Sequence, residues 1–151
     1  MEQKSIQPKK VVVKSTKTTL SQIAKATEPL LDSLFSQVQK NGITPVGPLE
    51  FIYFGATGDV NKQFDLEIAL PVLADEKLAS SDLQTKDTNA ITCMSHVHKG
   101  SLETIMNTYD ELFKELEWNK IIPTNEVREV YLNWVDFSSD ENITEIQIGI
   151  N

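Results

Sequence analysis

The residues best suited to chemistry lie at alternating positions of one β-rich run, residues 127–135. Three polar or aromatic side chains are spaced two apart there: Glu129, Tyr131 and Asn133. Because successive side chains of a strand point to opposite faces, these three share one face, and the apolar residues between them, beginning with Val130, share the other. We expect the apolar residues to face the helices, so that Glu129 and Tyr131 point into an open cleft.

A carboxylate beside aromatic rings is suited to two kinds of chemistry. It attracts a cation by charge, and each ring face adds about 0.5–2 kcal/mol of cation–π attraction. Alternatively, Glu129 is a general base that directs water at an electrophilic carbon, while Tyr131 or Tyr53 stabilises or protonates the leaving group. A structural role, in which Glu129 is a solvated edge residue or pairs with Arg128, stays open on the alternation alone.

Three further candidates for a ligand site lie in the first half of the chain. Phe51 and Tyr53 share one side of the β-rich run 48–54. Both sides of that run are largely apolar, so core packing is an equal alternative for these two rings. Glu67 alternates with apolar residues in the run 64–72 and faces away from them, where an ordinary polar strand face is the simpler interpretation.

Metal and phosphate chemistry find little support in the sequence. His96 and His98 are two residues apart on a predicted strand, but the chain has no third histidine to complete a zinc site, and its one cysteine, Cys93, reads as a small buried residue of that strand. We therefore predict no metal and no cofactor, and we expect His98 to shape the turn before Gly100 and the start of the helix that follows. The segment 55–59 has two glycines without the spacing or the lysine of a phosphate-binding loop. Cys93 is the only cysteine, which excludes an intrachain disulfide.

The elements that must position these residues occur twice in the same order. Each half predicts a strand, an amphipathic helix and two more strands: residues 11–19, 20–40, 48–54 and 64–72, then 90–98, 101–119, 127–135 and 144–150. We therefore predict an α+β fold in which duplicated strand-helix-strand-strand units form an antiparallel sheet. Two long helices would cover one face of this sheet and leave a ligand cleft on the other.

The domain organisation follows from this duplication. Residues 1–10 read as a polar, frayed leader, and residues 11–151 as a single domain with pseudo-repeats at about 11–73 and 89–151. The polar segment 74–89 would link the two repeats. A length of 151 residues is typical of one domain.

The composition excludes several classes of protein. The net charge of −8 argues against unaided binding of nucleic acid. It would favour cationic partners through long-range attraction, but an acidic balance that serves solubility is the simpler interpretation. No apolar stretch approaches the roughly 20 residues of a membrane helix, and the N-terminus lacks the apolar region of a secretory signal. With a single cysteine, these features predict a cytoplasmic protein.

Several short motifs, taken in order, resemble one known family. They are His98-Lys-Gly100-Ser-Leu102 followed by Tyr109 and Leu112; Gly47-Pro48 followed by Tyr53; Phe64-Asp-Leu-Glu-Ile68 through Pro71-Val72; and Arg128-Glu-Val-Tyr-Leu132 ahead of Thr144-Glu-Ile146. Their order and spacing are similar to those of GyrI-like effector-binding domains. These domains are the ligand-sensing modules of AraC- and MerR-type multidrug regulators, and also occur as free-standing proteins.

The resemblance implies a duplicated fold and a small-molecule binding function. It implies a cationic or amphipathic, often aromatic, ligand held for sensing or sequestration in an acidic, aromatic-lined cleft. The cleft residues would be Glu129, Tyr131, Tyr53, Phe51, Asn133 and Glu67. Some members hydrolyse strained cyclopropane compounds and one relative acts on DNA gyrase, so a hydrolase using Glu129 and Tyr131, or a regulator with a protein partner such as gyrase, are the alternatives. With about ten residues before the first strand, we expect the sensing domain alone, without a DNA-reading domain.

Overall fold

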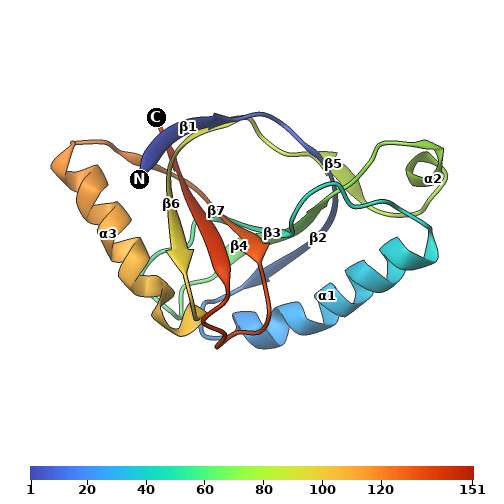
Figure 1. Ribbon diagram of the computed structural model, residues 1–151, viewed down its shortest axis with the longest axis horizontal. Helices are drawn as coiled ribbons and strands as arrows, with labels where there is room; N and C mark the ends of the chain where they lie inside the picture. The colour runs from blue at the N-terminus through green and yellow to red at the C-terminus, as the bar shows by residue number, and fades with distance from the viewer. The chain divides into compact units, whose positions relative to one another are not determined.

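The computed structural model describes residues 1–151, which form two compact units. We call Pro8–Asn89 the N-terminal unit, and Met1–Gln7 together with Ala90–Asn151 the C-terminal unit. Each unit contains one long helix and four antiparallel strands (Figure 1). This arrangement is the mixed α+β class that the sequence predicts.

The N-terminal unit contains six elements. They are β2 (Lys10–Thr18), α1 (Ile23–Lys40), β3 (Glu50–Phe54), β4 (Phe64–Pro71), the short helix α2 (Glu76–Ala79) and β5 (Thr85–Asp87). The strands lie side by side in the order β3-β4-β2-β5, and all neighbours are antiparallel. The predicted linker 74–89 is therefore structured in part, since it contains α2 and β5.

The C-terminal unit repeats this plan. Its elements are β1 (Glu2–Ile6), β6 (Ile91–Lys99), the 3₁₀ turn η1 (Leu102–Thr104), α3 (Ile105–Trp118), β7 (Pro123–Asn133) and β8 (Ile143–Ile150). The strand order is β1-β6-β8-β7, again antiparallel throughout. The order β2-α1-β3-β4 in one unit thus corresponds to β6-α3-β7-β8 in the other, which confirms the predicted duplication.

The N-terminal residues form an edge strand of the sheet. Every residue of β1 pairs with β6, from Glu2 opposite Ser95 to Ile6 opposite Ile91. The expectation that residues 1–10 are frayed is therefore wrong. The segment is polar because an edge strand exposes one side to water, and its partner lies about ninety positions further along the chain. The predicted repeat boundaries, 11–73 and 89–151, stay predictions.

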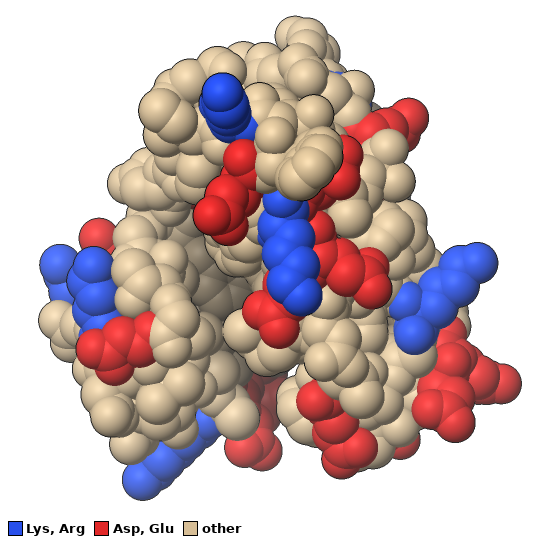
Figure 2. Space-filling model, turned by 90° about the vertical axis from the view of Figure 1, so that its left-hand side faces the viewer, with Lys and Arg blue, Asp and Glu red and all other residues tan.

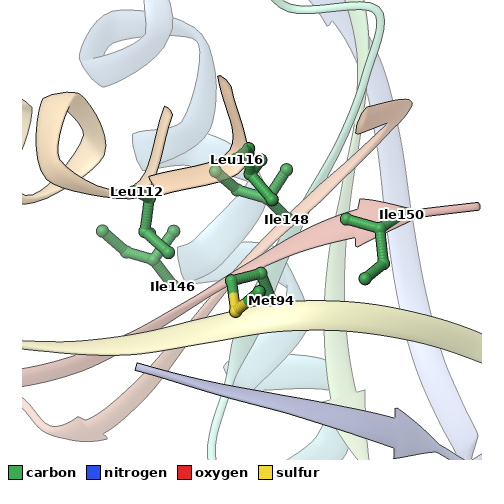
Figure 3. Close-up of a cluster of buried hydrophobic side chains, with 6 residues drawn as sticks. All are labelled: Met94, Leu112, Leu116, Ile146, Ile148 and Ile150. Carbon is green, nitrogen blue, oxygen red and sulfur yellow. The ribbon is translucent and has the colours of Figure 1, made fainter. Parts of the chain in front are cut away.

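The long helices pack through regularly spaced residues. The buried residues of α3 are Thr108, Leu112 and Leu116, four positions apart, which places them on one side of the helix. Figure 3 shows the two leucines of α3 above a cluster from the neighbouring strands, made of Met94, Ile146, Ile148 and Ile150. This cluster is the core on which the candidate site is built.

Helix α1 begins later than the predicted range 20–40 and ends where that range ends. It begins at Ile23, three residues after the predicted start at residue 20, and Pro29 lies inside the helix. The hydroxyl of Thr27 donates to the carbonyl of Ile23, one turn earlier in the same helix. The helix ends before Gly42, whose φ of +64° is the left-handed conformation expected at a helix end.

Candidate functional site

The candidate site in the C-terminal unit is centred on the carboxylate of Glu129 in β7. One carboxylate oxygen accepts a hydrogen bond from the hydroxyl of Tyr109 at 2.6 Å, and the other accepts from the hydroxyl of Tyr131 at 2.7 Å. Only 7% of Glu129 is exposed. A charge at this depth is costly unless it is hydrogen-bonded, and the two phenols supply such bonds.

Glu129 lies on the face of its sheet that α3 covers. Its partner Tyr109 belongs to α3, and Ile146, the residue opposite Glu129 in β8, packs against Leu112 of the same helix. The expectation that Val130 and its neighbours face the helix, with Glu129 on the uncovered side, is therefore wrong. Both faces of β7 carry apolar residues, so hydrophobicity did not decide which one packs against α3.

Two exposed rings adjoin the phenols that hold the carboxylate. Phe113, one helical turn after Tyr109, stacks on it with ring centroids 6.4 Å apart. Trp134 makes an edge contact with Tyr131 at 5.7 Å. A register shift between Tyr131 and Asn133 interrupts the strand alternation and places Trp134 beside Tyr131. Phe113 is 44% and Trp134 50% exposed, so both rings are open to a ligand.

Asn133, a predicted site residue, has a different partner. Its side-chain amide donates to the carbonyl of Glu141 at 2.8 Å and so ties the end of β7 to the loop before β8. This contact is structural. A role of Asn133 in ligand binding stays a prediction.

Phe51 and Tyr53 lie close together in the N-terminal unit. Their ring centroids are 6.4 Å apart, and Tyr53 also contacts Phe64 at 5.5 Å. Tyr53 is buried and Phe51 half-buried. These contacts form an aromatic cluster within that unit, as the core-packing alternative expects, and a ligand role for either ring stays a prediction.

These two rings also lie on the helix-covered face of their own sheet. Phe51 is opposite Ile68, and Ile68 is opposite Lys14, so all three share a face. The ammonium group of Lys14 donates to the side chain of Gln37 in α1 at 2.9 Å, which identifies this face as the one beneath α1. In each unit, therefore, the aromatic candidates lie on the helix side.

Glu67, by contrast, lies on the face away from α1. It is opposite Ile52, one residue out of phase with the rings of β3. Both of its oxygens accept hydrogen bonds from Lys86 of β5, at 2.9 and 3.0 Å. This ion pair favours the structural interpretation of Glu67 over a ligand-binding one.

Glu145 is the counterpart of Glu67 in the C-terminal unit. Burial of Glu145 opposes its ionisation, but hydrogen bonds from Gln147, Lys4 and Ser95 outweigh burial and hold the pKa of this carboxyl below its ordinary value. Lys4 in turn has a raised pKa, chiefly through its hydrogen bond to Glu145. One oxygen of this carboxylate, Oε2, is thus contacted by three side chains of its own unit.

The sequence did not identify Tyr109 as a site residue. Tyr109 lies on the apolar stripe of α3, and a tyrosine at such a position usually belongs to the core. The available signal was its phenolic hydroxyl, which needs a partner when buried, together with Phe113 four residues later on the same helix face. Nothing in the sequence around Tyr109 indicates that this partner is Glu129.

His98 shapes the start of α3, which confirms the prediction for it. Its Nε2 donates to the carbonyl of Ser101 at 2.8 Å, and its Nδ1 lies 2.7 Å from the hydroxyl of Thr108. His96 instead lies 3.3 Å from the carboxylate of Glu111. No group of three or more metal-ligating side chains gathers in the structure.

A separate shallow pocket lies at the turn between β3 and β4. Its volume is about 220 Å³, and it is lined by Lys17, Phe54, Gly55, Lys62, Gln63, Phe64 and Asp65. It contains none of the predicted site residues. None of the helices is long and apolar enough to span a membrane.

The chain is similar in fold to several solved structures. EcmrR in a complex with DNA aligns with a TM-score of 0.75 and 26% identity over 99% of this chain, which spans only 56% of that EcmrR chain. The EcmrR C-terminal domain alone aligns at 0.74 with 24% identity, covering 99% of this chain and 96% of that one. SAV2435 bound to tetraphenylphosphonium aligns at 0.71 with 12% identity, covering 99% and 93%.

Comparison with curated proteins finds no match. The family model described as the GyrI-like small molecule binding domain matches residues 1–151, the whole chain. The duplicated strand-helix-strand-strand plan agrees with this match. The chain therefore belongs to the GyrI-like small-molecule binding domain family.

Proposed function

We propose that this domain reversibly binds a cationic or amphipathic, usually aromatic, organic molecule. Its positive charge would be recognised by Glu129, and its apolar part by the neighbouring rings. The observation that carries the proposal is the nearly buried carboxylate of Glu129, held by the hydroxyls of Tyr109 and Tyr131. The binding would serve sensing or sequestration in the cytoplasm.

The electrostatics of Glu129 support a cationic ligand. A carboxylate that is largely withdrawn from water attracts a positive charge more strongly than an exposed one, because the effective dielectric constant is lower. The two phenol donors keep the carboxylate in one orientation, so little ordering remains for the ligand to impose.

The aromatic surroundings support a flat or ring-bearing ligand. Phe113 and Trp134 are half-exposed and lie against the two tyrosines that hold Glu129. Each ring face that meets a cation adds about 0.5–2 kcal/mol of attraction. Binding of tetraphenylphosphonium, an aromatic cation, by SAV2435, which shares this fold, is in keeping with such a ligand.

The similarity to EcmrR supports a sensing role over simple storage. EcmrR is seen on DNA, and the present chain aligns with about half of its length. We therefore propose that ligand occupancy of this domain informs a regulatory process. A separate regulator, or a protein target such as gyrase, would respond to whether the ligand is bound.

The test measures binding of tetraphenylphosphonium by isothermal titration calorimetry. Glu129→Gln keeps the shape of the side chain and removes its charge, so affinity for the cation should fall by about tenfold or more. Affinity for neutral triphenylphosphine oxide should change little. Glu67→Gln removes an equal charge from the N-terminal unit, on the face of its strands that α1 does not cover. It serves as the matched control and should leave both affinities nearly unchanged.

Two results would redirect the proposal. If Glu129→Gln binds tetraphenylphosphonium as tightly as the wild type, Glu129 is not the cation site. The second result concerns a carboxylic ester probe. If the wild type hydrolyses this probe, and Glu129→Gln binds it without hydrolysing it, the hydrolase alternative holds. Urea unfolding of each variant confirms that it is folded.

A further inference from the structure

The loop between β7 and β8, residues 134–142, is tightly built. Asn142, the last residue of the loop, is only 1% exposed; its amide group donates to the carbonyl of Asp136 and accepts from the backbone N–H of Val135. The carbonyl of Phe137 accepts a hydrogen bond from the backbone N–H of Leu102 at 2.9 Å. The loop conformation is therefore fixed by buried polar contacts.

This fixed loop presents large apolar side chains to water. Four residues at the end of β7 and in the loop are each 49–56% exposed: Leu132, Trp134, Val135 and Phe137. Exposed apolar residues are ordinary when they are scattered singly, but these four lie within six positions of the chain. Since the backbone around Asn142 is ordered, their exposure follows from the loop's architecture.

Acidic side chains border the same stretch. They are the exposed residues Asp136, Asp140, Glu141 and Glu103, and Glu103 is joined to the loop through the hydroxyl of Ser138. None of the four forms an ion pair. Lys99, the last residue of β6, lies opposite Ile143 at the start of β8, so one basic residue is close to the end of this loop. On the face drawn in Figure 2, acidic and basic side chains lie near one another in several groups, with uncharged areas between these groups.

We propose that this stretch, which we call the 132–141 surface, docks a basic amphipathic segment of a protein partner. Apolar side chains of the segment would cover Trp134 and Phe137, and its lysines or arginines would face the bordering carboxylates. Charge complementarity selects a basic segment over an acidic one and raises the rate of encounter. Trp134 also adjoins the ligand site proposed at Glu129, so the tests below leave Trp134 unchanged and substitute its neighbours.

The test uses a fluorescein-labelled synthetic peptide of leucine and lysine in an amphipathic helical pattern, and a control peptide with glutamate in place of lysine. Fluorescence anisotropy should detect binding of the lysine peptide alone. The double variant Val135→Ser/Phe137→Ser should weaken that binding by about tenfold or more. Trp118→Ser, at an 85% exposed residue at the end of α3, should not weaken it.

Charge variants separate specific docking from general attraction to an acidic protein. Asp140→Asn/Glu141→Gln should weaken the lysine peptide and reduce the salt dependence of its binding. Asp110→Asn/Glu117→Gln removes the same charge from exposed positions of α3 and should have a smaller effect. Thermal unfolding of every variant checks that the fold is retained.

Three results would overturn the proposal. The first is equal or absent binding of the two peptides. The second is equal loss of binding in the surface variants and in their controls on α3. The third is self-association of the wild type, measured by sedimentation, that Val135→Ser/Phe137→Ser abolishes. That last result would assign the 132–141 surface to a second copy of the chain.

Discussion

Lys4 of β1 reaches across β6 to Glu145 of β8, with the ammonium nitrogen 3.0 Å from the carboxylate oxygen. The other unit repeats this relationship, since Lys86 of β5 reaches across β2 to Glu67 of β4 at 2.9 Å. Each lysine comes from a short edge strand, and each glutamate from the strand that ends its repeat. The duplication thus extends from the order of elements to a specific ion pair.

Replacing Lys4 with methionine should destabilise the C-terminal unit by about 1–2 kcal/mol. The substitution keeps the apolar stem of the side chain but leaves the largely buried Glu145 carboxylate without its cation. Urea unfolding followed by circular dichroism gives the change in free energy. Hydrogen exchange should show the largest loss of protection in β1.

Lys17→Met is the matched control for that prediction. Lys17 pairs with Asp65 at 3.4 Å, but both side chains are mostly exposed, so the loss should stay below about 0.5 kcal/mol. An equal loss in the two variants would show that burial of Glu145 adds nothing to the Lys4 ion pair.

The Glu145 ion pair should also give stability a defined pH dependence. Because the pKa of Glu145 is lowered in the folded state, its contribution is present above the ordinary value of about 4.3 and is lost as pH falls through the folded value. Because the pKa of Lys4 is raised, its contribution is present below about 10.4 and is lost as pH rises through its folded value. The unfolding free energy of the wild type minus that of Glu145→Gln should therefore shrink at both extremes of pH. A difference that is constant from pH 3 to 11 would contradict this assignment.

The sequence predicts the elements well because each depends on a local pattern. The alternation of Leu66, Ile68 and Leu70 and the four-residue spacing of Leu112 and Leu116 need no knowledge of distant residues. Strand β1 was missed for the opposite reason. Its residues are polar, and what holds them is pairing with β6 and the contact of Lys4 with a residue near the other end of the chain.

The candidate site could be predicted only in part. The sequence singles out Glu129 and Tyr131, and the structure joins them by a hydrogen bond. The sequence does not reveal that Val127, and not Val130, packs on the side of α3, since both residues are valines. Tyr109 enters the site only once that face is known.

Tyr109→Phe should destabilise the fold by about 1–3 kcal/mol, since it removes one donor from the buried carboxylate of Glu129 and keeps the ring. In a double-mutant cycle with Glu129→Gln, the two losses should be non-additive by about 1 kcal/mol. Chemical unfolding of the four proteins provides the measurement. Strict additivity would mean that the 2.6 Å contact contributes no coupling energy.

His98→Ala should cost about 2–4 kcal/mol, because it opens a cavity and leaves the hydroxyl of Thr108 and the carbonyl of Ser101 without their ring partner. His96→Ala, which removes only a contact with the exposed Glu111, should cost less than about 1 kcal/mol. Thermal unfolding compares the two. Similar losses would show that His98 does not hold the start of α3.

Gly149→Ala should be among the most damaging single substitutions in the sheet. A Cβ at Gly149 would lie 2.3 Å from the hydroxyl oxygen of Thr124 and 2.9 Å from the carbonyl oxygen of Glu126, in the irregular part of β7 where the register with β8 shifts. Forcing this overlap apart should cost about 3 kcal/mol.

Two companion variants make the Gly149 prediction specific. Gly58→Ala, whose added Cβ would meet nothing within 4 Å, should change stability by less than about 0.5 kcal/mol. Gly149→Ala combined with Thr124→Ala should recover only part of the loss, because the Glu126 carbonyl belongs to the backbone and cannot be removed. Urea unfolding of the three variants measures these changes. Full recovery in the double variant would show that the side chain of Thr124, and not the close approach of the β7 backbone, is what requires glycine at this position.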